Sequence, residues 1–559
     1  MWSKLVCLLF ILYFGNNFCS SQDDPLPEID TPLGRVRGYW KLSLDGRKHA
    51  AFEGIPYAKP PIGDLRFEAP QPISPWSDTW VATSPQTCIQ AEFFGSKNIN
   101  GHEDCLYLNV YVPAEFLNDP KDLEVIVAIH GGAFMVGSGH SVTNSKMLLD
   151  KDIVLVTVNY RIGILGFLST EDDVIPGNNG MKDQVLALKW VRDNIASFGG
   201  NPHSVTLVGL SAGGASVHLH YFSPLSKGLF TKGVSQSGTA LAPWVVKKKA
   251  AQRAKALAVS LGCPDSPSEA LKSCLKRKPA MSLLQHLNQF YGIGSLPLSP
   301  FAPVVEKGSA NAFLDEEPYQ LLKEGKVLDV PWITSFATDD GLLPSAFFYS
   351  ELKKIDEYWT EIAPFLLDCN ETLPEAKKEV IPRQVLDYYL GEGEKISKEN
   401  FKKVTKIFTD RFFALPAELA AKLQAEATKS PVYFYQFNYT EGDVKMIQFY
   451  SKSQEIEGVA HGEDGLYFYG FVSSKTMSDK DKLLRNACQD MLYSYVTSGK
   501  PSFDGTDIWQ PTGPAELTYL VVTGPNNLKL EKTENLTPID FWSKLGLLEN
   551  EHTVVKDEL

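Results

Sequence analysis

The sequence has no excess of positive charge and, beyond its first residues, no long apolar run. Its 559 residues carry 54 Lys and Arg against 67 Asp and Glu, which gives a net charge of −13. Because no basic stripe is present either, we expect no nucleic-acid partner. A helix needs about 18 or more apolar residues to cross a bilayer. No later run reaches that length, so we expect no integral membrane span.

Internal repeats, low-complexity segments and linkers rich in Pro, Gly or Ser are also missing. At 43% hydrophobic and 22% charged residues, the composition is that of an ordinary globular protein. We therefore predict a single domain over residues 22–555, with long insertions. No cluster of Cys, His and carboxylate residues has the spacing of a metal site, so we expect neither a metal nor an organic cofactor.

Both ends of the chain carry targeting patterns. Residues 1–21 combine Lys4, an apolar stretch and a small-residue segment, which is typical of a secretory signal peptide. Residues 556–559 read KDEL, an address for the KDEL receptor. Together they predict a location in the lumen of the endoplasmic reticulum, with secretion as the alternative. Three N-x-[ST] sequences are candidate glycosylation sites in that compartment: Asn370, Asn438 and Asn535.

Cysteine is scarce, with eight residues in the whole chain, two of them within residues 1–21. The other six are Cys88, Cys105, Cys263, Cys274, Cys369 and Cys488. The first two could close one small loop and the next two another, and each bridge would contribute roughly 3 kcal/mol. The last two have no obvious local partner. Spacing alone does not prove any of these pairings.

Short apolar runs separated by helical patterns fill the middle of the chain. VIVAIH (125–130) and IVLVTV (153–158) are nearly all apolar, which is typical of strands buried on both faces of a mostly parallel sheet. Further strands are expected at 205–209, 232–236, 330–336 and 432–437, small β-hairpins within 31–61, and helices over 181–198 and 479–497. This alternation predicts an α/β fold, a central mostly parallel sheet with helices on both faces.

The segment VTLVGLSAGG (205–214) places Ser211 between glycines, directly after a predicted strand and before a helical run. The pattern G-x-S-x-G occurs by chance in many chains, but the strand-to-helix context is that of a nucleophile elbow. A serine hydroxyl needs a base, and an acyl transition state needs amide donors. Gly132 and Ala133, in the loop AIHGGAFMVG (128–137), and Ala212 are the candidate donors of an oxyanion hole.

Several segments together resemble the type-B carboxylesterase family, the carboxylesterase/cholinesterase branch of the α/β-hydrolases, and most of all its insect carboxylesterases. They are FEGIPYAKPPIGDLRF (52–67), EDCLYLNVY (103–111), HGGAF (130–134), NYRIGILGFL (159–168), FGGNPHSVTLVGLSAGG (198–214) and GVAHGEDGLYF (458–468). The resemblance spans nearly the whole mature chain. It implies an α/β-hydrolase fold with small N-terminal β-hairpins and helical insertions, and the disulfides Cys88–Cys105 and Cys263–Cys274.

The same resemblance implies a Ser-His-acid triad. His461, in GVAHGED, takes the place of the general base. The acid follows a strand in SFATDDGLLP (335–344), where the family usually has Glu before Gly. Asp340 stands at that position, and we favour it over the adjacent Asp339. An aspartate can still hold the imidazole tautomer and stabilise imidazolium.

The sequence departs from the family pattern beside the nucleophile. Leu210 stands where the family often has Glu, and we interpret it as a modifier of rate or selectivity. The loop closed by Cys88 and Cys105 lacks the Trp that cholinesterases use to bind choline, which argues against a choline ester. With Leu210, several aromatics are candidates for an apolar substrate pocket: Phe134, Trp244, Phe347 and, beyond these, Phe290, Tyr291, Phe348 and Phe468.

These residues predict a serine hydrolase acting on small hydrophobic carboxylic esters through an acyl-enzyme. Two alternatives stay open. One is a juvenile-hormone esterase, acting on a hydrophobic methyl ester. The other is a catalytically silent, neuroligin-like binding protein, which the presence of Ser211 and His461 and the lack of a membrane span disfavour. The sequence does not predict the oligomeric state.

Overall fold

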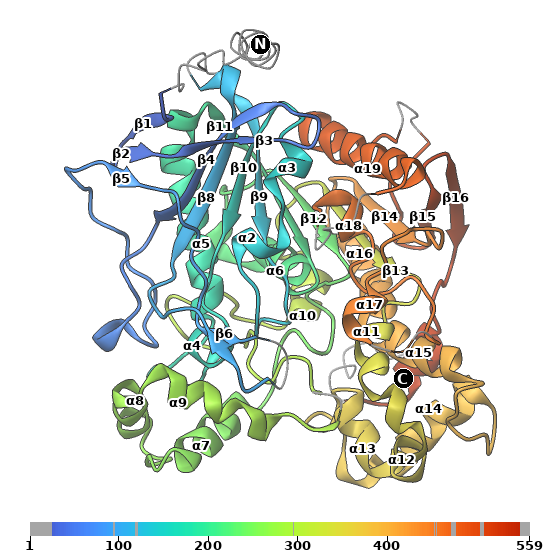
Figure 1. Ribbon diagram of the computed structural model, residues 1–559. Helices are drawn as coiled ribbons and strands as arrows, with labels where there is room; N and C mark the ends of the chain where they lie inside the picture. The colour runs from blue at the N-terminus through green and yellow to red at the C-terminus, as the bar shows by residue number, and fades with distance from the viewer. Residues whose placement is uncertain are drawn as a thin grey trace, which may run out of the picture.

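A large twisted sheet forms the centre of the molecule (Figure 1). The structure is a computed structural model that describes residues 25–92, 96–117, 121–293, 296–451, 453, 455–470, 477–503 and 508–547. Among these, eleven strands form one sheet in the order β16-β15-β14-β13-β12-β11-β9-β10-β8-β4-β3. Their bounds are β3 (Tyr39–Leu42), β4 (Lys48–Pro56), β8 (Tyr107–Pro113), β9 (Leu123–Ile129), β10 (Ile153–Val158), β11 (Gly200–Leu210), β12 (Lys232–Gln236), β13 (Trp332–Ala337), β14 (Val432–Phe437), β15 (Leu517–Gly524) and β16 (Asn527–Thr533).

The sheet is parallel in its middle and antiparallel at both edges. Every neighbouring pair from β10 through β15 is parallel, whereas β8, β4 and β3 on one side and β16 on the other run antiparallel to their neighbours. The central strands are rich in buried apolar residues because both faces of the sheet are covered: all six residues of β10 (IVLVTV) are buried. Because the strands from β10 through β15 are parallel, their carboxyl ends lie at the same edge of the sheet. In α/β sheets the loops at this edge bring functional side chains together.

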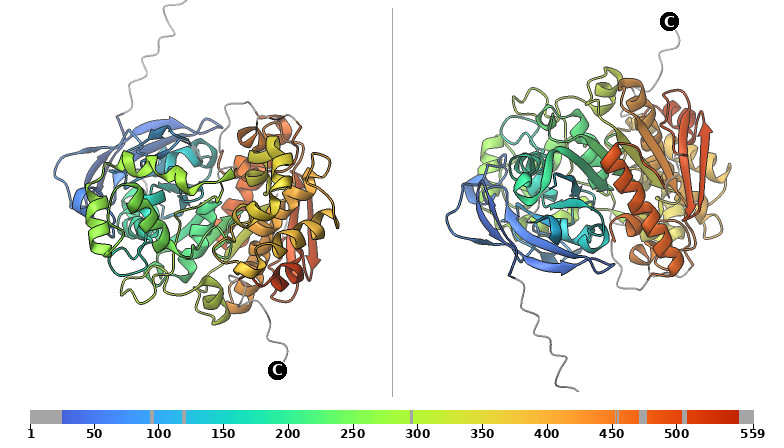
Figure 2. Two further views of the ribbon diagram at one scale, coloured as in Figure 1. Left: turned by 90° about the horizontal axis from the view of Figure 1, so that it is seen from below. Right: turned by 90° about the horizontal axis from the view of Figure 1, so that it is seen from above.

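Helices pack on both sides of this sheet (Figure 2). They include α5 (Asn179–Asn194), α6 (Ala212–Phe222), α16 (Leu415–Ala427) and α19 (Asp479–Ser498). Helix α6 contacts β9, β11 and β12, and α16 contacts β13, β14 and β15. None of the helices in the described part of the chain is both long and apolar enough to cross a membrane.

Two further groups of helices lie at the lower end of the molecule in Figure 1. One consists of α7 (Ala250–Ser260), α8 (Ser268–Arg277) and α9 (Ala280–Gln285), and the other includes α12 (Leu352–Glu357), α13 (Trp359–Leu366) and α14 (Val380–Leu390). Both come from the long insertions between sheet strands. A disulfide joins Cys263 to Cys274 at the first group, and a second joins Cys88 to Cys105, so both predicted bridges are present.

The predicted α/β pattern is confirmed, with differences at the margins. The strands expected at 153–158, 232–236 and 432–437 coincide with β10, β12 and β14. The N-terminal hairpin β3–β4 is not a separate unit, because β4 pairs with β8 and extends the main sheet. A separate small sheet is formed by β1 (Glu28–Thr31), β2 (Gly34–Arg37) and β5 (Trp80–Val81). Strands β8, β15 and β16 were not expected.

The predicted targeting sequences, glycosylation sites and remaining cysteines can be located relative to the described residues. The signal peptide (1–21) and the KDEL sequence (556–559) lie outside the described residues. Of the candidate glycosylation sites, Asn535 is exposed and Asn370 and Asn438 are half-buried. The two remaining cysteines, Cys369 and Cys488, are both buried.

Candidate active site

Ser211 stands at a sharp turn between β11 and α6. Its backbone has φ 61° and ψ −125°, a region that costs free energy for a residue with a side chain. The turn needs glycine on both sides: a Cβ on Gly209 would lie 2.3 Å from the carbonyl carbon of Gly213, and one on Gly213 would lie 2.1 Å from the carbonyl oxygen of Ile129. The amide of Ser211 donates to the carbonyl oxygen of Gln236 at 2.8 Å, which fixes the strained residue to β12.

The glycine-rich loop after β9 lies directly against this turn. A Cβ on Gly131 would sit 3.1 Å from Ser211 Cβ. Gly132 and Ala133 follow with positive φ of 106° and 54°, and Ala212 is the first residue of α6. Among the described residues, the amides of Gly132, Ala133 and Ala212 donate to no protein acceptor. Two such amides in a loop and one at a helix N-terminus are suited to bind a negatively charged oxygen.

His461 and Asp340 are in direct contact. Nδ1 of His461 lies 2.9 Å from Oδ1 of Asp340, whose side chain is fully buried. The other carboxylate oxygen of Asp340 accepts from the amide of Ala337 at 2.8 Å, so both oxygens are fixed. Because a carboxylate faces Nδ1, we assign the ring proton there and leave Nε2 as an acceptor. Nε2 is buried and has no hydrogen-bond partner within the described residues.

Two further side chains hold His461 in place. Tyr450 donates from its hydroxyl to the carbonyl oxygen of His461 at 2.7 Å. The ring of Phe413 packs on the imidazole at a centroid distance of 4.6 Å. Phe413 comes from a π-helical turn, Asp410–Ala414, which precedes α16. Such turns inside helices often occur at functional sites because they redirect one side chain.

Asp339 points to a different partner. Its Oδ2 accepts from the amide of Val459 at 3.0 Å, and its own amide donates to the carbonyl of Val459. Burial raises the pKa of the Asp339 carboxyl. Asp339 therefore braces the segment that leads into His461, whereas Asp340 contacts the imidazole itself.

Three further histidines, in the sheet core around the elbow, are buried and make structural contacts. His130 Nδ1 lies 2.8 Å from the carbonyl of Gly131, His218 Nδ1 accepts from the amide of Ala240, and His220 contacts Ser226 and Gln184. Burial lowers the pKa of His130 to about 4 and that of His218 and His220 to about 3. They stay neutral, and none lines the cavity described below.

Two buried carboxyls follow His461 and were not singled out from the sequence, although both stand in the motif GVAHGED. Burial raises the pKa of Glu463 to about 8 and that of Asp464 to about 6. Oδ2 of Asp464 accepts from Tyr435 at 2.7 Å and from Nε2 of Gln236 at 3.0 Å. Since the carbonyl of Gln236 also holds the amide of Ser211, Asp464 connects the histidine loop to the elbow.

A cavity of about 810 Å³ opens over these groups. Ser211 and His461 both line it, together with residues 131–133 of the glycine-rich loop. Of the predicted pocket residues, Leu210 and Trp244 line the cavity. The further lining side chains Leu298, Leu343, Phe413 and Tyr450 were not predicted.

Phe134 and Phe347 are corrections to the predicted pocket, because neither belongs to the cavity lining. Phe134 is completely buried: its positive φ of 60° turns the ring away, where it packs on Phe167 and Trp244. Phe347 contacts the lining residue Tyr450, with the two rings edge to face at 6.4 Å. Each of the two rings therefore contacts a lining side chain without lining the cavity itself.

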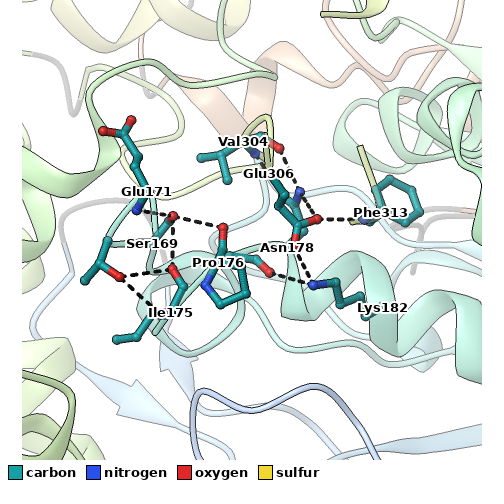
Figure 3. Close-up of polar contacts among 11 residues, drawn as sticks. Ser169, Glu171, Ile175, Pro176, Asn178, Lys182, Val304, Glu306 and Phe313 are labelled. Atoms are coloured by element: carbon teal, nitrogen blue, oxygen red, sulfur yellow. Dashed lines mark hydrogen bonds and ion pairs between the residues drawn. The ribbon is translucent and has the colours of Figure 1, made fainter. Parts of the chain in front are cut away.

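A buried polar network fixes the segment that follows Leu298 (Figure 3). Asn178 donates to the carbonyl of Val304 at 2.7 Å and to Glu306 at 2.8 Å, and it accepts from the amide of Val304 at 2.9 Å. Lys182 forms an ion pair with Glu306, and both side chains are buried. This network attaches the 296–306 segment to the start of α5.

The residues of the site can supply a nucleophile, a base oriented by a carboxylate, and amide donors. In the described part of the chain, no group of three His, Cys, Asp or Glu side chains is arranged to hold a metal ion. The chemistry that this set can carry out is acyl transfer by a serine.

Comparisons with known proteins agree with this chemistry. The sequence model of the Carboxylesterase family matches residues 25–542. A carboxylic ester hydrolase of Bombus ignitus is 39% identical over 98% of this chain and 98% of that protein. Venom carboxylesterase-6 of Apis mellifera is 38% identical over 97% of this chain and 98% of that protein.

A solved structure extends the likeness to three dimensions. The crystal structure of juvenile hormone esterase from Manduca sexta, with OTFP covalently attached, has a TM-score of 0.83 and 28% sequence identity. The superposition covers 93% of this chain and 99% of the Manduca sexta chain. This likeness confirms the α/β-hydrolase fold predicted from the sequence. The match of the family model along nearly the whole described chain leads to one conclusion: the chain belongs to the carboxylesterase family.

Proposed function

We propose that the protein is a serine carboxylic-ester hydrolase in which Ser211, His461 and Asp340 form the catalytic triad. The observation that carries the proposal is the buried contact of Asp340 with His461 Nδ1, which leaves Nε2 unpartnered beside the cavity that Ser211 lines. The family match and the esterases among the relatives support the reaction class.

In the acylation step, the Ser211 hydroxyl oxygen attacks the carbonyl carbon of the ester while His461 Nε2 takes the hydroxyl proton. The carbonyl oxygen becomes negative and is bound by the amides of Gly132, Ala133 and Ala212. Asp340 keeps the Nδ1 proton in place and stabilises the imidazolium. The C–O bond to the alcohol then breaks, and His461 returns the proton to the leaving alcohol.

In the deacylation step, water attacks the acyl carbon in place of the alcohol. His461 Nε2 takes a proton from the water, and the same three amides bind the second oxyanion. Collapse of this intermediate breaks the bond to Ser211 and returns the proton to the serine oxygen. The products are the free carboxylic acid and the original enzyme.

Turnover of p-nitrophenyl butyrate by the purified chain and its Ser211→Ala variant tests the proposal. We expect the variant to lose at least about 10⁴-fold in kcat with an unchanged thermal unfolding midpoint. A folded S211A variant that keeps wild-type turnover would show that another group is the nucleophile.

Juvenile-hormone ester hydrolysis is the second candidate function. It is favoured by the likeness to the Manduca sexta juvenile hormone esterase, whose sequence is 28% identical. Comparison of kcat/KM on the hormone and on a short-chain naphthyl ester separates the two candidates. A preference for the hormone of about 100-fold or more favours the narrower function.

We also propose that the protein resides in the lumen of the endoplasmic reticulum and binds the KDEL receptor, with partial secretion as the alternative. The sequences of residues 1–21 and 556–559 and the two disulfides support an oxidising compartment. Expression of the full chain and of a chain lacking residues 556–559 tests this. Retention should be lost only in the truncated chain.

A further inference from the structure

The cavity over Ser211 has two chemically different walls. One, here called the polar wall, comes from residues 84–87, from the loop closed by the Cys88–Cys105 disulfide and from the start of α2 (Gly139–Val142). Its side chains include Gln86, Thr87, Asn100, His102 and Ser138. The other, the apolar wall, comes from the insertions and carries Trp244, Leu298, Leu343 and Phe413.

The polar wall is fixed rather than adaptable. Besides the disulfide, two backbone hydrogen bonds join the segment around Thr87 to the segment around His102. The amide of His102 donates to the carbonyl of Thr87, and the amide of Ile89 donates to the carbonyl of His102. The side chain of Gln90 spans to the glycine-rich loop, accepting from the amide of Gly137 at 2.7 Å and donating to its carbonyl at 2.9 Å. The polar wall is therefore held at a set distance from the amides that receive the oxyanion.

Some polar side chains of this wall have no hydrogen-bond partner among the described residues. In the described chain, the side chains of Thr87, Asn100 and His102 make no hydrogen bond to the protein. Asn100 and His102 are exposed at the mouth of the cavity. No Lys or Arg is among the described lining residues, and the one carboxylate, Glu92, is exposed and accepts from Asn98. Apart from the exposed Glu92 carboxylate, the wall thus offers uncharged hydrogen-bonding groups such as those of Gln86, Thr87 and Asn100.

The apolar wall lies deeper. Trp244 is 1% exposed, Phe413 and Leu298 are 2% exposed, and Leu343 is 7% exposed. An apolar chain placed here loses its contact with water, which stabilises it by about 25 cal/mol per Å² of apolar surface.

The different depths of the two walls suit them to different halves of an ester. The alcohol leaves first, and the acyl group stays bonded to Ser211 until water attacks. An alcohol held at the exposed mouth can leave directly to solvent, whereas an apolar acyl group held at the buried side stays out of contact with water. Resting on the proposed esterase function, we propose that the substrate is an ester of an apolar carboxylic acid with a neutral, hydroxyl-bearing alcohol, held by Thr87, Asn100 and His102.

Two octanoate esters that share one acyl-enzyme test the proposal. 1-Octanoylglycerol and n-propyl octanoate differ only by two hydroxyl groups on the alcohol, so they form the same acyl-enzyme. The ratio of their kcat/KM values, divided by the ratio of their rates of hydroxide-catalysed hydrolysis, therefore reports the polar wall. We expect a preference of about tenfold for the glycerol ester, since each neutral hydrogen bond contributes roughly 2- to 10-fold. Equal or better hydrolysis of the propyl ester overturns the proposal.

Variants of the two walls locate the preference. In Thr87→Val and Asn100→Leu the ratio should fall toward one, whereas Leu298→Ala should lower both kcat/KM values and keep their ratio. A loss of folded protein changes both terms equally and leaves the ratio intact. Polar-wall variants that keep the wild-type ratio contradict the proposal.

Two more substrates separate the possible failures. Octanoylcholine has a charged alcohol, and its hydrolysis at a higher kcat/KM than 1-octanoylglycerol would contradict a neutral alcohol site. p-Nitrophenyl octanoate reports the basic reaction. If it is not hydrolysed, the esterase function itself fails; if it is hydrolysed without a glycerol-ester preference, only the alcohol class is wrong.

Discussion

Replacement of Asp340 by Asn tests the proton arrangement at the centre of the site. Oδ2 of Asp340 accepts from the amide of Ala337 at 2.8 Å, so the amide oxygen of an Asn must occupy that position. The amide NH₂ group then faces Nδ1 of His461, which lies 2.9 Å from Oδ1 in the wild type. Because NH₂ can only donate, Nδ1 must become the acceptor and the ring proton must move to Nε2. In that tautomer Nε2 cannot take the proton of Ser211.

The expected loss is large because the wrong tautomer removes the base entirely. A comparable change in a serine protease triad lowers kcat about 10⁴-fold, equivalent to ~5 kcal/mol of transition-state stabilisation at about 1.36 kcal/mol per tenfold. KM should change little, since the substrate does not contact Asp340. The assay is p-nitrophenyl butyrate turnover, with circular dichroism as the check on folding.

Asp339→Asn is the matched control. Asp339 accepts from the amide of Val459, and an Asn oxygen can replace that acceptor. We expect this variant to lose less than about tenfold in kcat. The reasoning is refuted if D340N keeps more than a tenth of the wild-type turnover, or if D339N rather than D340N is inactive.

The remaining predictions concern the surroundings of the triad. Burial raises the pKa of Asp464 from 3.8 to about 6, so the native state binds its proton more tightly than the unfolded chain. The contribution of Asp464 to the free energy of unfolding should therefore fall as the pH rises from about 4 to 6. The Asp464→Asn variant does not lose this contribution, so over that window its stability should gain up to ~3 kcal/mol relative to the wild type, apart from a pH-independent offset. Urea unfolding at pH 4 and 7 measures this, and a constant difference contradicts it. Lys182→Met leaves Glu306 buried without its cation and should lower the free energy of unfolding by about 3–5 kcal/mol. The double variant Lys182→Met/Glu306→Gln should recover most of this loss. A double variant with the full loss would show that the unpaired charge is not the cause. Leu210→Glu buries a carboxyl at a site 5% exposed and should alter the pH dependence of kcat/KM; an unchanged pH profile and substrate preference would show that Leu210 is not a modifier.

The parts of the site that lie within one contiguous segment were the parts that the sequence could predict. The elbow at Ser211 and the loop at Gly132 have local requirements for small residues, because their backbones approach to within van der Waals contact. His461 also stands in a distinctive motif. The choice between Asp339 and Asp340 depends on a turn after β13, where the backbone of Asp339 pairs with Val459 and Asp340 turns toward the imidazole.

The cavity walls could not be predicted in the same way. Leu298, Leu343 and Phe413 come from separate insertions, and only the packing of those insertions brings them to one cavity. Phe134 was expected in the pocket as one of several aromatic candidates, but it is buried in the core, where its ring packs on Phe167 and Trp244. Edge strand β16 (NLKLEKT) was not predicted because it has three charged residues and only two apolar ones, so it lacks the apolar run of the central strands.

Covalent labelling by diethyl p-nitrophenyl phosphate tests the central claim most directly. The phosphorus atom is attacked as an ester carbonyl would be, p-nitrophenolate leaves, and the diethylphosphoryl group stays on the nucleophile. We predict one label per chain, on the peptide that contains Ser211, with an equal amount of p-nitrophenol released and a much slower reaction in His461→Ala. A label on a different residue, or an unlabelled Ser211 in a chain that still hydrolyses esters, would contradict the account.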